Sequence, residues 1–370
     1  MGKKNALLFL IAKTFHIAVG LCLLLSLLTP YINPAKFPLL PFLGLGFPVL
    51  ILLNIVFCIL WFFKNRTWFL CSLILFGLSL PYQMKIFSFN VLPTDIPKES
   101  DSQIKLMSYN VRLFDLYNPS MKNAKSTRNG IFKYFRDEEP DILCIQEYYE
   151  QKKPSSFITI DSIVEIMDDP QIHIKGIQIP RNRQTFGLAT FSKLPVVNKG
   201  YIKHQGANKN NNNYCIYIDV TREKDTLRIY NVHLQSIKLE TNYATKNTKD
   251  DGTENTQSTI KTAYRKLKKA FAIRAEQSKT VSQHIKKSPY PTIVCGDFND
   301  TPISYTYHIF ENELIDAFRN TSSGFGSTYI GLLPAGRIDY IFHSKELNST
   351  SFKIQKEKLS DHRAISCVIY

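Results

Sequence analysis

One short stretch of the chain joins an apolar strand to a cluster of polar side chains. In TIVCGDFNDTP, residues 292–302, a β-branched and apolar run leads directly into Asp297, Asn299 and Asp300. A chain that only had to turn would need one Asn or Asp beside Gly. The cluster therefore indicates a functional site at the end of this strand, with Asp300 equally suited to capping the turn that follows.

Similar polar residues stand at the ends of other apolar runs. They are Asn110 and Arg112 in SYNVR, Gln146 and Glu147 in DILCIQEYY, Asn231 and His233 in YNVHLQS, Asp339 in RIDYIF, and Asp361 and His362 in SDHRAI. Singly, such an Asn is commonly a turn residue, and a His among apolar residues is commonly part of a core. Jointly, nearly all of them follow or interrupt a strand, which is where α/β enzymes place their catalytic groups.

These residue types favour one kind of chemistry. The sequence has no nucleophile elbow and no Gly-rich phosphate loop. Carboxylate and amide oxygens are ligands that suit Mg²⁺ or Mn²⁺ better than zinc. A hard cation and a His would neutralise charge that builds on phosphate oxygens, while a carboxylate takes a proton from water. The set therefore favours hydrolysis of a phosphodiester.

Alternating strands and helices must position these side chains. Strands are expected near residues 104–109, 142–145, 187–191, 214–220, 227–232, 292–295, 338–342 and 365–369, and helices near 126–138 and 259–286. Several strands are apolar on both faces, as in sheets buried between other layers. The pattern predicts two packed sheets with helices outside, an α/β sandwich.

Three further segments between the strands carry many polar residues. The segments 204–215 and 242–257 are rich in Asn, Thr and Lys and are expected to be solvated loops. In the helix expected at 259–286, apolar residues fall roughly on one face and lysines cluster on the other. That basic face is either simply solvated or an electrostatic footprint for a polyanion.

The first 95 residues have a different character. No acidic residue precedes Asp95, and apolar stretches cover about residues 6–28, 39–63 and 68–84, the last ended by Pro81. A membrane span needs roughly 20 apolar residues, so we predict three transmembrane helices. A cleaved signal peptide and a buried soluble bundle are the alternatives. Two further spans disfavour the first, and the nearly unbroken apolar run around WFFKNRTWFL disfavours the second.

Basic residues in the short loops predict the orientation. Lys3 and Lys4 precede the first span, and Lys64 and Arg66 join the second to the third, whereas the intervening loop holds only Lys36. Positive charge is retained on the cytoplasmic side, so the residues after the third span are expected on the opposite face. In a bacterium this would be an inner-membrane protein facing the periplasm or exterior. The seven cysteines show neither zinc spacing nor a disulfide framework.

The motifs SYNVR, QE, NVHL, GDFN, RIDY and SDH, in this order, resemble the endonuclease/exonuclease/phosphatase superfamily. That superfamily includes pancreatic-type deoxyribonuclease, abasic-site endonucleases, neutral sphingomyelinases and inositol polyphosphate phosphatases. The resemblance implies a four-layer α/β sandwich with its site at one edge of the two sheets. The resemblance covers roughly 104–370, the expected catalytic domain. The expected membrane region at 1–90 and linker at 91–103 lie outside it.

The resemblance also implies roles for the metal and base residues. Glu147 would be the principal ligand of Mg²⁺, or of Mn²⁺ in its place, with Asn110 and Asp361 nearby. Asp297 would orient or deprotonate the attacking water, and Asn299 would hold the phosphate together with Asn110 and Arg112.

The histidines complete the implied site. Asp339 would pair with His362, which would contact the phosphoryl group, and His233 would act on the leaving group. One departure weakens the role of His233: Gln184 and Thr185 stand where a supporting carboxylate is expected.

These observations favour a membrane-anchored, Mg²⁺-dependent, nuclease-like phosphodiesterase. The residues after Asp95 include 39 basic against 30 acidic side chains, which favours a polyanionic substrate, although no aromatic ladder for stacking bases is evident. A phospholipid or an inositol or sugar-phosphate head group is the alternative substrate, because a tether beside a bilayer raises the effective concentration of lipids. An inactive membrane-anchored binding module is the alternative from a different functional class.

Overall fold

A computed structural model describes most of the chain, as two compact units. One unit comprises residues Met1–Tyr82, Gln235–Glu276 and Ile303–Tyr305, and the other comprises Gln83–Leu234, Gln277–Pro302 and Thr306–Tyr370. The residues described are 3–90, 103–118, 120–151, 157–179, 181, 183–203, 215–237, 256–331 and 336–370. Nearly all of the predicted linker and most of the two Asn- and Thr-rich segments lie outside them.

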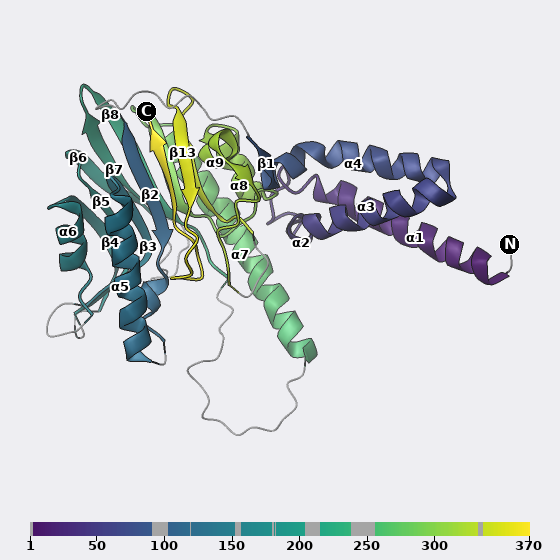
Figure 1. Ribbon diagram of the computed structural model, residues 1–370, viewed down its shortest axis with the longest axis horizontal. Helices are drawn as coiled ribbons and strands as arrows, with labels where there is room; N and C mark the ends of the chain where they lie inside the picture. Colours follow the sequence, from purple (N-terminus) through teal and green to yellow (C-terminus); the bar gives the residue numbers. More distant parts are fainter. Residues whose placement is uncertain are drawn as a thin grey trace, which may run out of the picture. The chain divides into compact units, whose positions relative to one another are not determined.

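The second unit contains two six-stranded sheets (Figure 1). The first has the order β13-β14-β2-β3-β5-β4, with bounds Ser349–Ile354, Ile365–Ile369, Ile104–Asn110, Ile142–Gln151, Gln184–Ser192 and Gln171–Ile179. The second has the order β10-β12-β9-β8-β7-β6, with bounds Ile315–Asp316, Asp339–His343, Thr292–Asp297, Asp225–His233, Cys215–Arg222 and Val196–Ile202. A further two-stranded sheet pairs β1 (Ser88–Phe89) with β11 (Ser323–Gly324).

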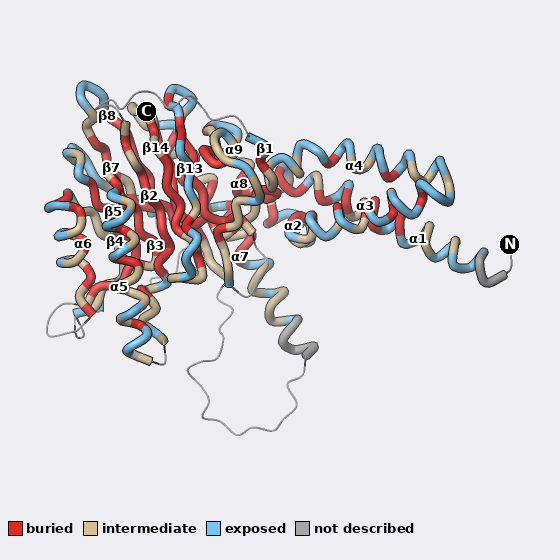
Figure 2. The backbone as a smooth tube through the Cα atoms, in the orientation of Figure 1, coloured by how far each residue is buried: buried red, intermediate tan, exposed pale blue. Residues whose placement is uncertain are grey.

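Apolar side chains fill the space between the two large sheets. Leu106, Ile142 and Cys144 of the first sheet belong to one buried cluster with Ile229 and Cys295 of the second. Strands buried on both faces read as nearly continuous apolar runs, which explains why these strands are visible in the sequence. Figure 2 shows the buried residues concentrated along these central strands.

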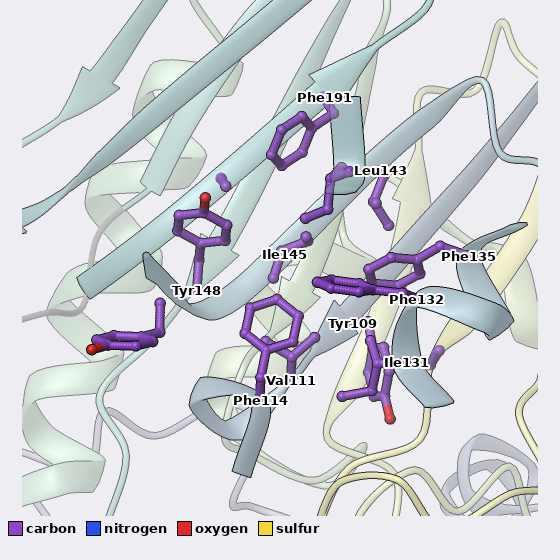
Figure 3. Packing of buried hydrophobic residues seen from close by; sticks show 14 of the residues in the cluster. Tyr109, Val111, Phe114, Ile131, Phe132, Phe135, Leu143, Ile145, Tyr148 and Phe191 are labelled. Carbon is purple, nitrogen blue, oxygen red and sulfur yellow. The ribbon is translucent and has the colours of Figure 1, made fainter. Parts of the chain in front are cut away.

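Helices cover the outer face of each sheet. On the first, α5 (Met121–Glu138) packs through residues such as Ile131 and Phe135 (Figure 3). The helix α6 (Ile160–Met167) packs on it through Ile163. On the second, α8 (Tyr305–Glu311) and the end of α7 (Thr256–Ile285) contribute Phe310 and Val281. The short α9 (Ala317–Thr321) follows β10. The predicted four-layer α/β sandwich is therefore confirmed.

The other unit contains the apolar helices α1 (Lys3–Ser26) and α3 (Phe47–Lys64) and most of α4 (Arg66–Ile86). All three are long and apolar enough to cross a membrane. The second predicted span differs from the structure at its start. The stretch 39–63 is split, because α2 (Leu40–Leu45) ends at Gly46 before α3 begins, and each helix has a Pro in its first turn, where no N–H is needed. Helix α4 continues through Pro81, which apolar helices of this kind tolerate.

Polar side chains join the three long helices to one another. The Trp61 indole donates to Nδ1 of His16 (3.1 Å), the Ser72 hydroxyl lies 3.1 Å from Nε2 of His16, and the Asn54 amide donates to the Ser72 carbonyl (3.1 Å). Such hydrogen bonds connect helices in an apolar environment. Lys13, which also lies inside a span, places Nζ 4.5 Å from the Phe9 ring centre.

Candidate active site

Asp297 lies between two residues that the second sheet holds at the same level. It ends β9, where the parallel strand β8 places His233 opposite it and the antiparallel strand β12 places Asp339 opposite it. All three residues are buried. Residues far apart in the sequence thus form a row across the end of one sheet.

The first sheet contributes a second group of residues. Asn110 ends β2, Glu147 lies in the neighbouring parallel strand β3, and the segment 360–362 approaches from before β14. The Ser360 hydroxyl donates to the Asn110 carbonyl (2.9 Å). The Asn110 amide donates to Oδ2 of Asp297 (2.9 Å), which links the two sheets directly.

Two imidazoles flank the Asp297 carboxylate. Nε2 of His233 lies 3.6 Å from Oδ2 of Asp297, and Nε2 of His362 lies 3.7 Å from the same oxygen. The other ring nitrogen of His362 lies 3.0 Å from Oδ2 of Asp339, which fixes the ring orientation. His233 also lies 3.9 Å from Oε1 of Glu147. The structure therefore brings together Asp297, Asp339, Glu147 and both histidines.

Left-handed backbone conformations occur at several of these positions. Glu147 has φ 50° at a bulge in β3, and Asn299 has φ 54° directly after β9. Non-glycine residues in this region store strain that commonly marks functional sites. Gly296 has φ 141°, and a Cβ there would lie 1.9 Å from the Val232 carbonyl oxygen, so only glycine fits before Asp297.

Arg112 begins a left-handed turn that runs to Asp115, the 3₁₀ element η1 (Arg112–Asp115). Phe114 within it is fully buried and contacts Phe132 and Tyr148, and this packing offsets the unfavourable backbone. The Arg112 side chain is 55% exposed, with Nε 3.8 Å from Oδ2 of Asp361. The turn therefore presents a guanidinium to solvent beside Asp361.

The two residues after Phe298 have different surroundings. The Asn299 backbone N–H donates to Oδ1 of Asp297 (2.8 Å), and its side-chain amide donates to the Leu234 carbonyl (3.1 Å). Oδ1 of Asp300 accepts from the backbone N–H of Thr301 (3.2 Å). Of the two readings of Asp300, this contact supports the turn cap.

Burial and neighbouring charges change how the site titrates. Burial raises the pKa of Asp297 to about 6; His362 opposes this shift and Asp339 reinforces it. The Glu147 side chain is one-third exposed, yet burial by the surrounding protein raises its pKa. Asp361 raises this pKa further, whereas His362 lowers it. Burial alone would lower the pKa of His362, but Asp339 and Asp297 outweigh it and raise the value to about 10.

Comparison with known families decides how this geometry is classified. Residues 107–362 match the family model described as the Endonuclease/Exonuclease/phosphatase family. The chain belongs to this family. Proteins of the endonuclease/exonuclease/phosphatase family are in general hydrolases of phosphoester bonds and typically use a divalent metal. Residues 5–86 match a second family model, described only as a domain of unknown function. Among curated proteins, none matches the chain.

Solved structures from the family share the fold. A family protein from Leptotrichia buccalis C-1013-b is 17% identical, with a TM-score of 0.51, and the match covers 72% of this chain and 99% of that chain. One from Bacteroides vulgatus is 16% identical, with a TM-score of 0.52 and coverages of 72% and 98%. One from Beutenbergia cavernae DSM 12333 is 15% identical, with a TM-score of 0.51 and coverages of 72% and 71%.

Two groups of side chains in this family site have the donor types that a divalent metal needs. Ligand atoms of Asp297, Asp339 and His362 lie within 4.8 Å of one another. The oxygens of this group already accept hydrogen bonds from Asn110, Asn299 and His362.

Glu147 and Asp361 form a second candidate position for a cation. The Asp361 carboxylate helps to raise the pKa of Glu147, and a cation between the two would relieve that repulsion. Together with the Asn110 amide, they offer the hard oxygen donors that Mg²⁺ prefers. The donor set therefore fits the metal that the family typically uses.

Residues in the 323–331 segment also belong to the site and were missed from the sequence. The Tyr329 ring lies 5.2 Å from the His362 ring, and burial together with Asp361 and Asp297 raises the pKa of its hydroxyl. The Thr328 hydroxyl accepts from the backbone N–H of Asp339 (3.1 Å). Neither residue follows an apolar strand, so the pattern that identifies the other residues gives no signal for them.

Gln146 and Asn231, expected at strand ends, lie within β3 and β8 and outside the site. The Gln146 amide donates to Oδ1 of Asn231 (2.7 Å), and the Asn231 amide donates to the Ala189 carbonyl (3.0 Å). Both side chains are fully buried. They connect the two sheets through hydrogen bonds.

Replacement of Asp339 by Asn is expected to lower the pKa of His362 by at least about one unit. The change removes the carboxylate that contributes most to keeping His362 protonated. In metal-free protein, NMR titration should place the wild-type midpoint near 10 and the variant midpoint nearer 6.5. The signal of His173, on β4, provides an internal control. An unchanged His362 midpoint in the variant would contradict the assigned pairing.

The same shift links stability to pH. The folded-state pKa of His362 lies above the ordinary value of 6.5, so the charged imidazole stabilises the fold fully below that pH. This contribution is lost as the pH rises through about 10.

Proposed function

We propose that the chain is a membrane-anchored, Mg²⁺-dependent phosphodiesterase with nuclease-like chemistry. The observation that carries this proposal is the buried Asp297 carboxylate, with the imidazoles of His233 and His362 less than 4 Å from one of its oxygens. A water molecule beside this carboxylate would have a base on one side and N–H donors for a phosphate on the other. Family membership supports the same class of reaction.

Asp297 acts as the general base in the proposed reaction. Its raised pKa makes it a better proton acceptor than an ordinary carboxylate while leaving it largely ionised at neutral pH. It takes one proton from water as the water oxygen attacks phosphorus. The bond from phosphorus to the leaving oxygen breaks as the new bond forms, so the product is a phosphomonoester and an alcohol.

The two histidines and three polar side chains interact with the phosphodiester group of the substrate. His362, held charged by Asp339, donates a hydrogen bond from its Nε2–H to a phosphate oxygen as negative charge develops there. His233 supplies a proton to the leaving oxygen. Arg112, Asn110 and Asn299 hold the remaining phosphate oxygens, with the exposed guanidinium of Arg112 suited to the part of the substrate nearest solvent.

Glu147, with Asn110 and Asp361, would hold the cation. When bound there, a divalent cation supplies neutralisation of negative charge on the phosphate. Replacement of Glu147 by Gln is expected to weaken Mn²⁺ binding by about tenfold or more, because it removes one of the two charged ligands. Electron paramagnetic resonance titration of free Mn²⁺ measures this. Glu165→Gln, a substitution of an exposed residue on α6, is the control and should leave the affinity for Mn²⁺ unchanged. An unchanged affinity in Glu147→Gln would show that the metal binds elsewhere.

A phospholipid head group is the second candidate substrate. The observation that favours it is the set of three helices able to cross a membrane, which would hold the site near lipid. The full chain should be tested on plasmid DNA, RNA, phospholipid vesicles and inositol phosphates, each with Mg²⁺ or EDTA. Turnover confined to nucleic acid supports the nuclease-like proposal, and release of a head group supports the alternative. A chain that binds these compounds but hydrolyses none is a binding module.

The three helices are proposed to place the N-terminus and the catalytic domain on opposite faces of the membrane. In right-side-out bacterial spheroplasts, added protease should therefore cleave a C-terminal epitope tag and spare an N-terminal one. Permeabilised cells, in which both tags are cleaved, provide the control. Protection of the C-terminal tag in intact spheroplasts would reverse the proposed orientation.

A further inference from the structure

The segment between the first two long helices has features of a membrane-surface element. It runs from Leu27 to Gly46, includes α2, and connects two helices that each have the length of a span. Its exposed side chains include Tyr31, Phe37, Leu39 and Leu45. Aromatic and apolar residues of this kind gather at the boundary between lipid and water. In a membrane, this segment therefore lies at one surface of the bilayer.

The first part of α7 packs against this segment within the same compact unit. The rings of Phe42 and Tyr264 are stacked, with centres 5.1 Å apart, and the Phe271 ring meets the Phe42 ring edge-on at 5.4 Å. The Asn33 amide also lies within hydrogen-bonding distance of Oε1 of Glu276 (3.4 Å). These contacts keep residues 264–276 next to the surface segment.

Residues 256–276 of α7 carry a strong positive charge. They include six Lys or Arg residues and one acidic residue, Glu276. Four of the basic residues are exposed: Lys261, Arg265, Lys268 and Lys269. With about 100° of rotation per residue, these four fall within roughly 100° of one another around the helix axis. The ring contacts of Tyr264 and Phe271 occupy the adjoining face, so the basic face flanks the α2 contact.

We propose that this basic face of α7 binds the anionic head groups of the membrane in which the protein is anchored. Charges act over about 10 Å at moderate salt, so proximity to the surface decides whether they bind lipid. Each basic side chain at an anionic surface strengthens association by about fivefold. The aromatic contacts with Phe42 hold α7 near the membrane surface, and the exposed Lys and Arg side chains provide the positive charge. The inference rests on the membrane anchoring proposed above and is independent of the phosphodiesterase activity.

Hydrogen–deuterium exchange of the full chain in lipid nanodiscs tests this proposal. The nanodiscs contain phosphatidylcholine alone or with an equal amount of phosphatidylglycerol. Exchange of peptides from 256–276 is expected to slow by roughly tenfold or more in the anionic nanodiscs. The effect should disappear in 1 M salt, where screening reduces the range of charge interactions to about 3 Å.

Two matched variants distinguish lipid binding by the basic face of α7 from a general effect of positive charge on the protein. The variant K261Q/R265Q/K268Q/K269Q should lose the protection, whereas K193Q/K224Q/K287Q/K345Q, which removes four exposed lysines elsewhere, should retain it. Equal exchange in both lipids, or equal loss in both variants, would overturn the proposal.

Two further outcomes would also overturn the proposal. Protection by an oligonucleotide in neutral nanodiscs, without protection by anionic lipid, would assign the surface to nucleic acid instead. A chain that fails to float with lipid would overturn the membrane anchoring and this inference together, while leaving the proposed chemistry to be judged by its own assay.

Discussion

Replacement of Asp297 by Asn is expected to lower phosphodiester turnover by about 10³-fold or more, because the amide cannot accept the proton of the attacking water. The change preserves the shape of the side chain, and an amide oxygen can still accept the backbone N–H of Asn299. His362→Ala should cause a loss of similar size, since it removes the charged donor beside the same carboxylate. Initial rates at saturating substrate, measured with Mg²⁺, test both variants.

Asp300→Asn is the matched control for Asp297→Asn. It makes the same chemical change three residues later, at a side chain whose oxygen accepts the Thr301 N–H and which has no place in the proposed reaction. Its turnover should stay within about tenfold of the wild type. If Asp297→Asn and His362→Ala also retained turnover within that range, the assignment of the catalytic residues would be wrong.

Replacement of Arg337 by Met is expected to lower the free energy of unfolding by about 3–5 kcal/mol, because it leaves the buried Asp316 carboxylate without its charged partner. Nη1 of Arg337 lies 2.6 Å from Oδ2 of Asp316, and both side chains are almost fully buried. The guanidinium also lies 4.6 Å from the Phe318 ring centre and 4.8 Å from that of Tyr340. Urea unfolding followed by near-ultraviolet circular dichroism measures the change.

Arg319→Met provides the comparison. Nη1 of Arg319 lies 2.7 Å from Oε1 of Glu311, but its side chain is 34% exposed. Ion pairs that keep contact with solvent contribute less than buried ones, so this variant should lose clearly less stability than Arg337→Met. Equal destabilisation by the two variants would show that burial of the Arg337 pair is not the source of the effect.

The sequence predicts the interior of the sandwich better than its edges. All eight predicted strands occur, and they form the interior of both sheets. Strands β4, β6 and β13 were missed, and each is an edge strand with many partly or fully exposed residues. Since an edge strand is covered on fewer sides, it needs no long apolar run, and its pairing depends on a neighbour that the local sequence does not specify.

The candidate site is predictable to the extent that it lies on strand ends. Asp297, His233 and Asp339 follow apolar strands, and sheet register then aligns them. The bulge at Glu147 depends on tertiary packing, and so does the left-handed turn at Arg112–Asp115. Local propensity opposes such conformations in residues other than glycine.

Prediction of the membrane region from the sequence is limited in the same way. Hydropathy identifies three apolar helices, because it depends only on composition and length. It does not identify the break at Gly46 or the hydrogen bonds of His16, which depend on how the helices pack.

Metal-dependent turnover by the intact chain tests the central claim most directly. The purified full-length protein, in detergent, is assayed with bis(p-nitrophenyl) phosphate. We predict release of nitrophenol with Mg²⁺, loss of that activity with EDTA, and its return when excess Mg²⁺ is added. Turnover that EDTA leaves unchanged, or no turnover of this or any substrate in the panel with either Mg²⁺ or Mn²⁺, would contradict the proposal that Glu147, Asp297 and His362 form a metal-dependent phosphodiesterase site.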